Sequence, residues 1–98
     1  MTEQRRKSRS NGSRPAPRDA ARRASAELAE LLGREPEGIV SMERTDDGWR
    51  IGVEVLEVHR IPDTADLLAE YEVDARPGGQ LTGYRRVRRY TRGQADGD

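Results

Sequence analysis

The sequence predicts an α+β domain in which one N-terminal helix packs on a four-stranded antiparallel meander sheet. Three observations support this fold class. An alanine- and leucine-rich segment near the start has apolar residues at helical spacing, four later segments alternate between apolar and polar residues, and short turn sequences separate them. With 98 residues, no Phe and 33% hydrophobic residues, the chain is expected to form one small domain with a thin core.

Both ends of the chain are expected to be flexible. Residues 1–17 are rich in Arg, Ser, Gly, Pro and Asn, and they offer too little apolar surface to offset the entropy of ordering, which predicts a disordered basic tail. Residues 93–98 are polar and predict a flexible C-terminal tail. The domain itself is therefore expected to span residues 18–92.

The predicted helix covers residues 18–32. Gly33 follows it at the position where a residue in the left-handed conformation commonly ends a helix. Apolar side chains are small in the first half and larger in the second half, at Leu28, Leu31 and Leu32. We therefore expect mainly the second half to be buried, while the first half frays or contacts a partner.

Four segments are expected to be strands: GIVSMER (38–44), WRIGVEVLEVHRI (49–61), DLLAEYEVDA (66–75) and QLTGYRRVRRYTRG (80–93). The Asp-Gly pair between the first two predicts a hairpin turn. In the second strand the apolar residues change parity after Val55, which predicts either a β-bulge or burial of the far half on both faces. Trp49 opens this strand and is expected to be the largest core side chain, although an interface role is the alternative.

The motif YRRVRRY, residues 84–90, supplies the candidate binding residues of the chain. Simple alternation places Arg85, Val87 and Arg89 on one face of the strand and the other four side chains on the opposite face. The arginines are expected to pair with acids of their own chain, to contact a protein, or to hold single-stranded nucleic acid beside the tyrosines. The candidate partner-binding residues are Tyr84, Arg85, Arg86, Arg88, Arg89 and Tyr90.

The turn that precedes this strand leaves two registers open. A two-residue turn at Gly78 and Gly79 places Glu72 opposite Arg85. A three-residue turn that includes the preceding proline places Glu70 opposite Arg86 instead. Either register pairs an arginine with an acid and thereby neutralises part of the motif.

The charge distribution favours a protein partner over nucleic acid. Residues 1–26 hold eight Arg or Lys against two acids, residues 27–74 hold four against fourteen, and residues 75–98 hold six against two. The acidic middle block is expected to repel phosphates along most of the domain. The basic tail is either a solubilising segment or a means of recruiting an acidic partner.

Composition argues against several kinds of site. The chain has no Cys and a single His, which argues against a metal site, and no apolar run is long enough to span a bilayer, so a cytoplasmic location is the default. His59 near Asp63 and Asp66 is a formal acid–base arrangement, but no nucleophile accompanies it, and the chain lacks a phosphate-binding G-x-x-x-x-G-K motif. We therefore expect no catalytic residues.

The runs DDGWRIGVEVLEVHRIPDTADLLAEYEV and LTGYRRVRRYTRG, in this order, resemble the gas vesicle synthesis protein O family. The similarity covers about residues 27–93. It implies a cytoplasmic accessory protein required for making gas vesicles, with no catalytic residues and no cofactor. It also implies partners among other gas vesicle accessory proteins, including the AAA-type ATPase of the same gene clusters.

Two classes of function follow. The first is a non-enzymatic assembly factor or adaptor, associated with gas vesicles, that binds other gas vesicle proteins. The second is a small nucleic-acid-binding regulator that uses the basic tail and the strand 84–90. The acidic middle block favours the first.

Overall fold

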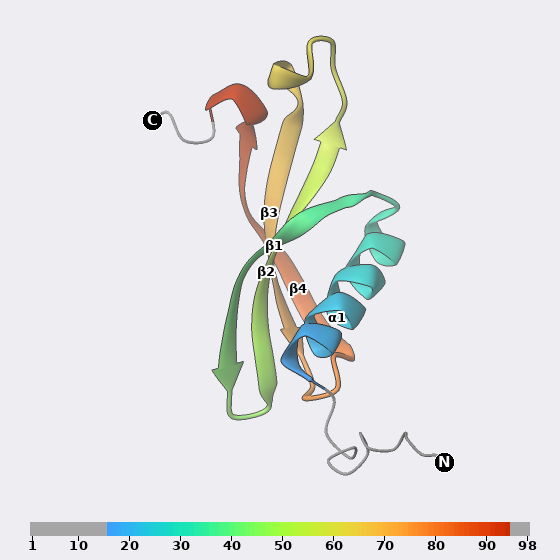
Figure 1. Ribbon diagram of the computed structural model, residues 1–98, viewed down its shortest axis with the longest axis vertical. Helices are drawn as coiled ribbons and strands as arrows, with labels where there is room; N and C mark the ends of the chain where they lie inside the picture. The colour runs from blue at the N-terminus through green and yellow to red at the C-terminus, as the bar shows by residue number, and fades with distance from the viewer. Residues whose placement is uncertain (1–15, 95–98) are drawn as a thin grey trace, which may run out of the picture.

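The computed structural model describes residues 16–94, in which one helix is followed by a four-stranded antiparallel sheet (Figure 1). The strands lie in the order β1-β2-β3-β4, so each strand pairs with its neighbours in sequence. This arrangement confirms the predicted α+β meander. The elements are α1 (Pro17–Leu32), β1 (Pro36–Thr45), β2 (Gly48–Val58), η2 (Asp63–Ala65), β3 (Leu67–Ala75), β4 (Leu81–Thr91) and η3 (Arg92–Gln94).

The predicted tails lie almost wholly outside the described residues. Of the N-terminal tail, only residues 16 and 17 are described, and Pro17 already belongs to α1. Of the C-terminal tail, only Gly93 and Gln94 are described, and both belong to η3.

Helix α1 ends as its sequence predicts. Gly33 adopts the left-handed conformation, with φ 67° and ψ 35°, and its N–H donates to the carbonyl of Ala29 at 2.8 Å. At the other end, Pro17 occupies the first turn, where its missing N–H leaves no helical hydrogen bond unmade.

The expectation that mainly the second half of α1 is buried is wrong. Three of the five buried residues lie in the first half of the helix, whereas Leu31 in the second half is 61% exposed. Small side chains allow the first half of the helix to approach the β3–β4 turn closely: a Cβ on Gly79 would lie 2.5 Å from the carbonyl oxygen of Ala20. The buried helix residues are Ala20, Ala21, Ala24, Ser25 and Leu28.

The core lies between α1 and one face of the sheet, which we call the helix face. Alternate residues of the two central strands supply most of it, together with Ala21, Ala24 and Leu28 of the helix. These strand residues are Ile51, Val53 and Val55 of β2 and Ala69, Tyr71, Val73 and Ala75 of β3. The opposite face, which we call the open face, carries the intervening residues.

Register shifts explain where strand alternation changes. The pairing of β2 with β3 shifts between Leu56 and Val58, so Glu57 is an extra residue, and the β-bulge alternative for this strand is confirmed. Strand β2 ends at Val58 rather than at Ile61, because residues 59–62 leave the ladder and form a loop toward η2. Thr45 pairs with Gly48, which confirms the predicted hairpin turn, and Asp46 and Asp47 are its two loop residues.

Candidate partner-binding surface

Strand β4 contains the arginine motif and forms one edge of the sheet (Figure 1). The turn before it has three residues, because the N–H of Arg76 donates to the carbonyl of Gln80 at 2.9 Å. A register shift then follows between Ala75 and Asp74, where Thr82 of β4 is an extra residue, and this shift places Glu72 opposite Arg85. The structure thus has the three-residue turn of one predicted register and the Glu72–Arg85 pair of the other.

A second shift in β4 changes which arginines share a face. Glu70 lies opposite Arg88 and Tyr71 lies opposite Arg86, so Val87 is an extra residue. The predicted alternation is therefore wrong beyond Arg86, because this bulge reverses the parity of the residues that follow it. The open face carries Arg85, Arg88 and Tyr90, and the helix face carries Tyr84, Arg86 and Arg89.

On the open face, the arginines pair with the acids of β3. Arg85 lies 2.7 Å from Glu72, and Arg88 lies 3.0 Å from Glu70. Arg50 of β2 makes a third pair of this kind, 3.1 Å from Asp74. These side chains are partly exposed, so each pair stabilises the fold by only about 0–1 kcal/mol.

Tyr90 joins the same face. Its hydroxyl donates to the carboxylate of Glu54, and the guanidinium of Arg88 lies 4.5 Å from the centre of its ring. Because Arg88 covers one side of the ring, that side is not available for stacking with a base. The open face presents a ladder of paired charges rather than an array of unpaired cations.

On the helix face, the arginines converge on Glu57, the extra residue of the β2 bulge. Its side chain is only 6% exposed and lies 2.8 Å from Arg89 and 3.7 Å from Arg86. The hydroxyl of Tyr71 donates to the same carboxylate at 3.4 Å. A guanidinium N–H of Arg34 donates to the backbone carbonyl of Glu57.

These contacts determine the protonation of the cluster. Burial by itself would raise the pKa of Glu57, but the hydrogen bond and charge of Arg89 and the charges of Arg86 and Arg34 outweigh it, so the pKa is lowered. The pKa of Tyr71 is raised, first by burial and then by the negative charge of Glu57. The cluster is thus an ionised carboxylate held by arginines.

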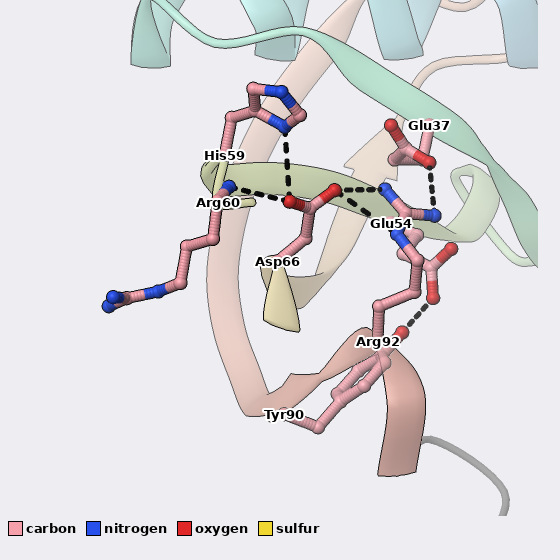
Figure 2. Close-up of polar contacts among 7 residues, drawn as sticks. All are labelled: Glu37, Glu54, His59, Arg60, Asp66, Tyr90 and Arg92. Atoms are coloured by element: carbon pink, nitrogen blue, oxygen red, sulfur yellow. Dashed lines mark hydrogen bonds and ion pairs between the residues drawn. The ribbon is translucent and has the colours of Figure 1, made fainter. Parts of the chain in front are cut away.

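A second buried carboxylate, Asp66, joins the loop after β2 to the end of β4 (Figure 2). Asp66 is 2% exposed and accepts the N–H of Arg60 at 2.7 Å and the guanidinium of Arg92 at 2.9 and 3.2 Å. The backbone N–H of Arg92 also donates to the carbonyl of Asp66 at 2.8 Å. Arg92 lies 3.1 Å from Glu37 as well, so it connects the start of β1 to the start of β3.

The Asp66 carboxylate is ionised and fully engaged. The N–H of Arg60 contributes most to lowering its pKa, burial opposes this effect, and the hydrogen bonds of Arg92 and His59 add to it. Nδ1 of His59 lies 3.1 Å from Asp66, so this predicted pair forms, but Asp63 has no hydrogen bond to His59 among the described residues. The imidazole lies beside a carboxylate that already accepts the backbone N–H of Arg60 and the guanidinium of Arg92, so its role here is structural.

Trp49 lies at the margin of the core rather than at its centre. It is half-buried, its indole N–H donates to the carbonyl of Pro77 at 3.3 Å, and Arg44 lies 5.0 Å from its ring. The expectation that it is the largest core side chain is therefore wrong. Leu28, Ile51, Val53, Val55 and Val73 are the largest fully buried apolar side chains.

Metal-binding and membrane-spanning features are both absent from the described part of the chain. Within residues 16–94, no group of three or more His, Asp or Glu side chains is arranged to hold a metal ion. In the same residues, no helix has the length and apolarity that crossing a membrane requires.

The fold and this surface define a small α+β domain whose charged side chains form ion pairs within the sheet. The model of the family described as Gas vesicle synthesis protein GvpO matches residues 3–96. The chain belongs to this family, as its sequence motifs predict. No solved structure gives a significant match to the chain.

Curated relatives agree with this assignment. Gas vesicle protein O of Streptomyces sp. (strain CB03234) is 57% identical over 84% of this chain and 64% of its own length. Gas vesicle protein O1 of Halobacterium salinarum is 40% identical over 76% of this chain and 63% of its own length. Gas vesicle protein O of Haloferax mediterranei is 43% identical over 76% and 54%, respectively. The chain thus spans less than two thirds of the length of these relatives.

Proposed function

We propose that this protein acts in gas vesicle formation as a non-enzymatic assembly factor that binds other gas vesicle proteins in the cytoplasm. Family membership supports the role in gas vesicle formation. The open face supports binding as the mode of action. Candidate partners are other gas vesicle accessory proteins, including the AAA-type ATPase of the same gene clusters.

The observation that carries the proposal is the pairing of the arginines on the open face. Arg85 and Arg88 already lie beside Glu72 and Glu70, so the strand offers little net positive charge to a phosphate backbone. A protein surface that has charges of both signs can form new ion pairs with these residues in place of the existing ones. Breaking the existing pairs costs little free energy, because exposed pairs contribute little to the stability of the fold. The geometry therefore favours a protein partner.

The test compares the tagged full-length chain with the double variant Arg85→Gln/Arg88→Gln in cells that form gas vesicles. We expect the variant to remain folded and to capture at least about tenfold less gas vesicle protein than the native chain, with or without nuclease. The matched control is Arg18→Gln/Arg60→Gln, which removes two exposed charges, one from α1 and one from the loop after β2. Equal capture by both variants would contradict a role for the open face.

Nucleic acid remains the second candidate function, because two tyrosines and four arginines share one strand. Titration of labelled single-stranded RNA into the chain at physiological salt separates the two. Micromolar or tighter binding that the Arg85→Gln/Arg88→Gln variant abolishes would replace the assembly-factor proposal by the nucleic-acid one. We expect no such binding from this strand.

A further inference from the structure

Strand β1 leaves one edge of the sheet without a pairing partner. Within residues 16–94 it pairs with β2 alone, and most of its residues are exposed, including Ile39 at 42% and Val40 at 51%. An edge strand of ten residues presents a row of unpaired N–H and C=O groups to any extended segment. We propose that a second copy of this chain pairs with β1 in antiparallel orientation, so that the two sheets become continuous.

The sequence of β1 is complementary to itself in one register. If Val40 lies opposite Ser41 of the second copy, then Glu37 lies opposite Arg44 of the second copy and Ile39 lies opposite Met42 of the second copy. A shift by one residue in one direction places Glu37 opposite Glu43, and like charges directly opposite each other are unfavourable. A shift in the other direction places Glu37 opposite Thr45 and Arg44 opposite Gly38, so the pair of opposite charges is lost. Twofold symmetry makes every favourable pair occur twice.

The existing bulge makes this register consistent with the faces of the sheet. Ile39 pairs with Val53 and Met42 pairs with Ile51, so both side chains lie on the helix face although they are three residues apart. The register shift between Ile39 and Ser41 accounts for this spacing. Opposite residues of an antiparallel pair share a face, so Ile39 meets the Met42 side chain of the second copy on the apolar side.

A groove between α1 and β1 lies beside the residues of β1 that would pair with the second copy. It has a volume of about 470 Å³, and it is lined by Arg22, Arg23, Ser25 and Ala26 of the helix and by residues 36–39 of the strand. In the proposed register, residues 42–45 of the second copy run along residues 36–39, and the acidic turn Asp46–Asp47 of the second copy follows at the end of this segment. The second copy would thus lie along the strand side of this groove.

The other edge of the sheet disfavours the same kind of self-pairing. Strand β4 contains four arginines and no acid, so two β4 strands placed edge to edge could not form cross-strand pairs of opposite charge like the proposed Glu37–Arg44 pair. Val87 of β4 is 40% exposed, which is similar to Val40 of β1. The two valines therefore form a matched pair for mutation.

The test measures the mass of the full-length chain by sedimentation from micromolar to near-millimolar concentration. We expect a reversible dimer for the native chain and for Val87→Lys. We expect Val40→Lys to raise the dissociation constant at least about tenfold, because the two new lysines lie next to each other across the twofold axis. A monomer at every concentration, or equal weakening by both substitutions, would overturn the proposal.

A charge swap tests the register and does not depend on the folding of the lysine variant. Glu37→Arg and Arg44→Glu should each weaken the dimer. The double variant should recover it, because residues 37 and 44 of the two copies would again carry opposite charges. Glu37→Arg also breaks the contact with Arg92, but the single and double variants share this loss. No recovery in the double variant would exclude this register. Self-association is measured without any other gas vesicle protein, so its failure would leave the proposed function intact.

Discussion

Replacement of Glu57 by Gln tests whether the arginines of β4 stabilise the fold through this carboxylate. The substitution keeps the shape of the side chain and removes its charge. The side chain of Glu57 is only 6% exposed, so the loss of stability should be larger than for a surface ion pair. The loss is limited because Arg86 and Arg89 are 46% and 49% exposed, so water can hydrate their guanidinium groups in the variant. We therefore expect a loss of about 1–3 kcal/mol, below the roughly 3–5 kcal/mol measured for fully buried pairs.

The assay is urea unfolding at neutral pH, supported by a thermal melt, in which this loss corresponds to a decrease of about 5–20 °C. The matched control is Glu30→Gln, which removes the same charge from an exposed position on α1. We expect the control to remain within about 0.5 kcal/mol of the native chain. A Glu57→Gln variant as stable as the control would refute the stabilising role of the cluster.

The stabilisation by Glu57 has a defined pH dependence. The pKa of Glu57 is lower in the folded state than its ordinary value of about 4.3 in the unfolded chain. Its contribution is therefore fully present above that value and is lost as pH falls through the folded pKa. The difference in unfolding free energy between the native chain and Glu57→Gln should shrink in acid, and a constant difference would show that charge is not its cause.

Two further predictions concern packing. Trp49→Ala should cost about 2 kcal/mol in urea unfolding, since the ring is only half-buried and a fully buried Trp costs about 3–5 kcal/mol; a loss of about 5 kcal/mol or more would place the ring in the core. Gly79→Ala should cost well over about 1 kcal/mol, because φ is +95° and the added methyl group would meet Ala20. Gly38→Ala is its control in the same melts, since a Cβ there meets nothing within 4 Å, and equal effects at both glycines would contradict the close helix–turn contact.

Local signals in the sequence determined the fold class and the family of this protein. The helix, its end at Gly33 and the hairpin turn before Gly48 all follow from contacts between residues a few positions apart, so local patterns predict them. The Glu72–Arg85 pair belongs to one of the two registers that the sequence predicts. The sequence could limit the choice to two because a short turn restricts the pairing of the strands that it connects. The motifs in residues 46–73 and 81–93 also indicate the family by themselves, because several short motifs occur together in one order.

Only the tertiary structure decided which charged residues act together. The bulge at Val87 changes the faces of Arg88 and Arg89, and such an insertion depends on the packing of neighbouring strands rather than on the sequence of one strand. Glu57 meets Arg89 across 32 residues, and Arg92 meets Glu37 across 55 residues. Contacts over such separations leave no periodic signal in the sequence, because the route of the whole sheet determines which side chains meet.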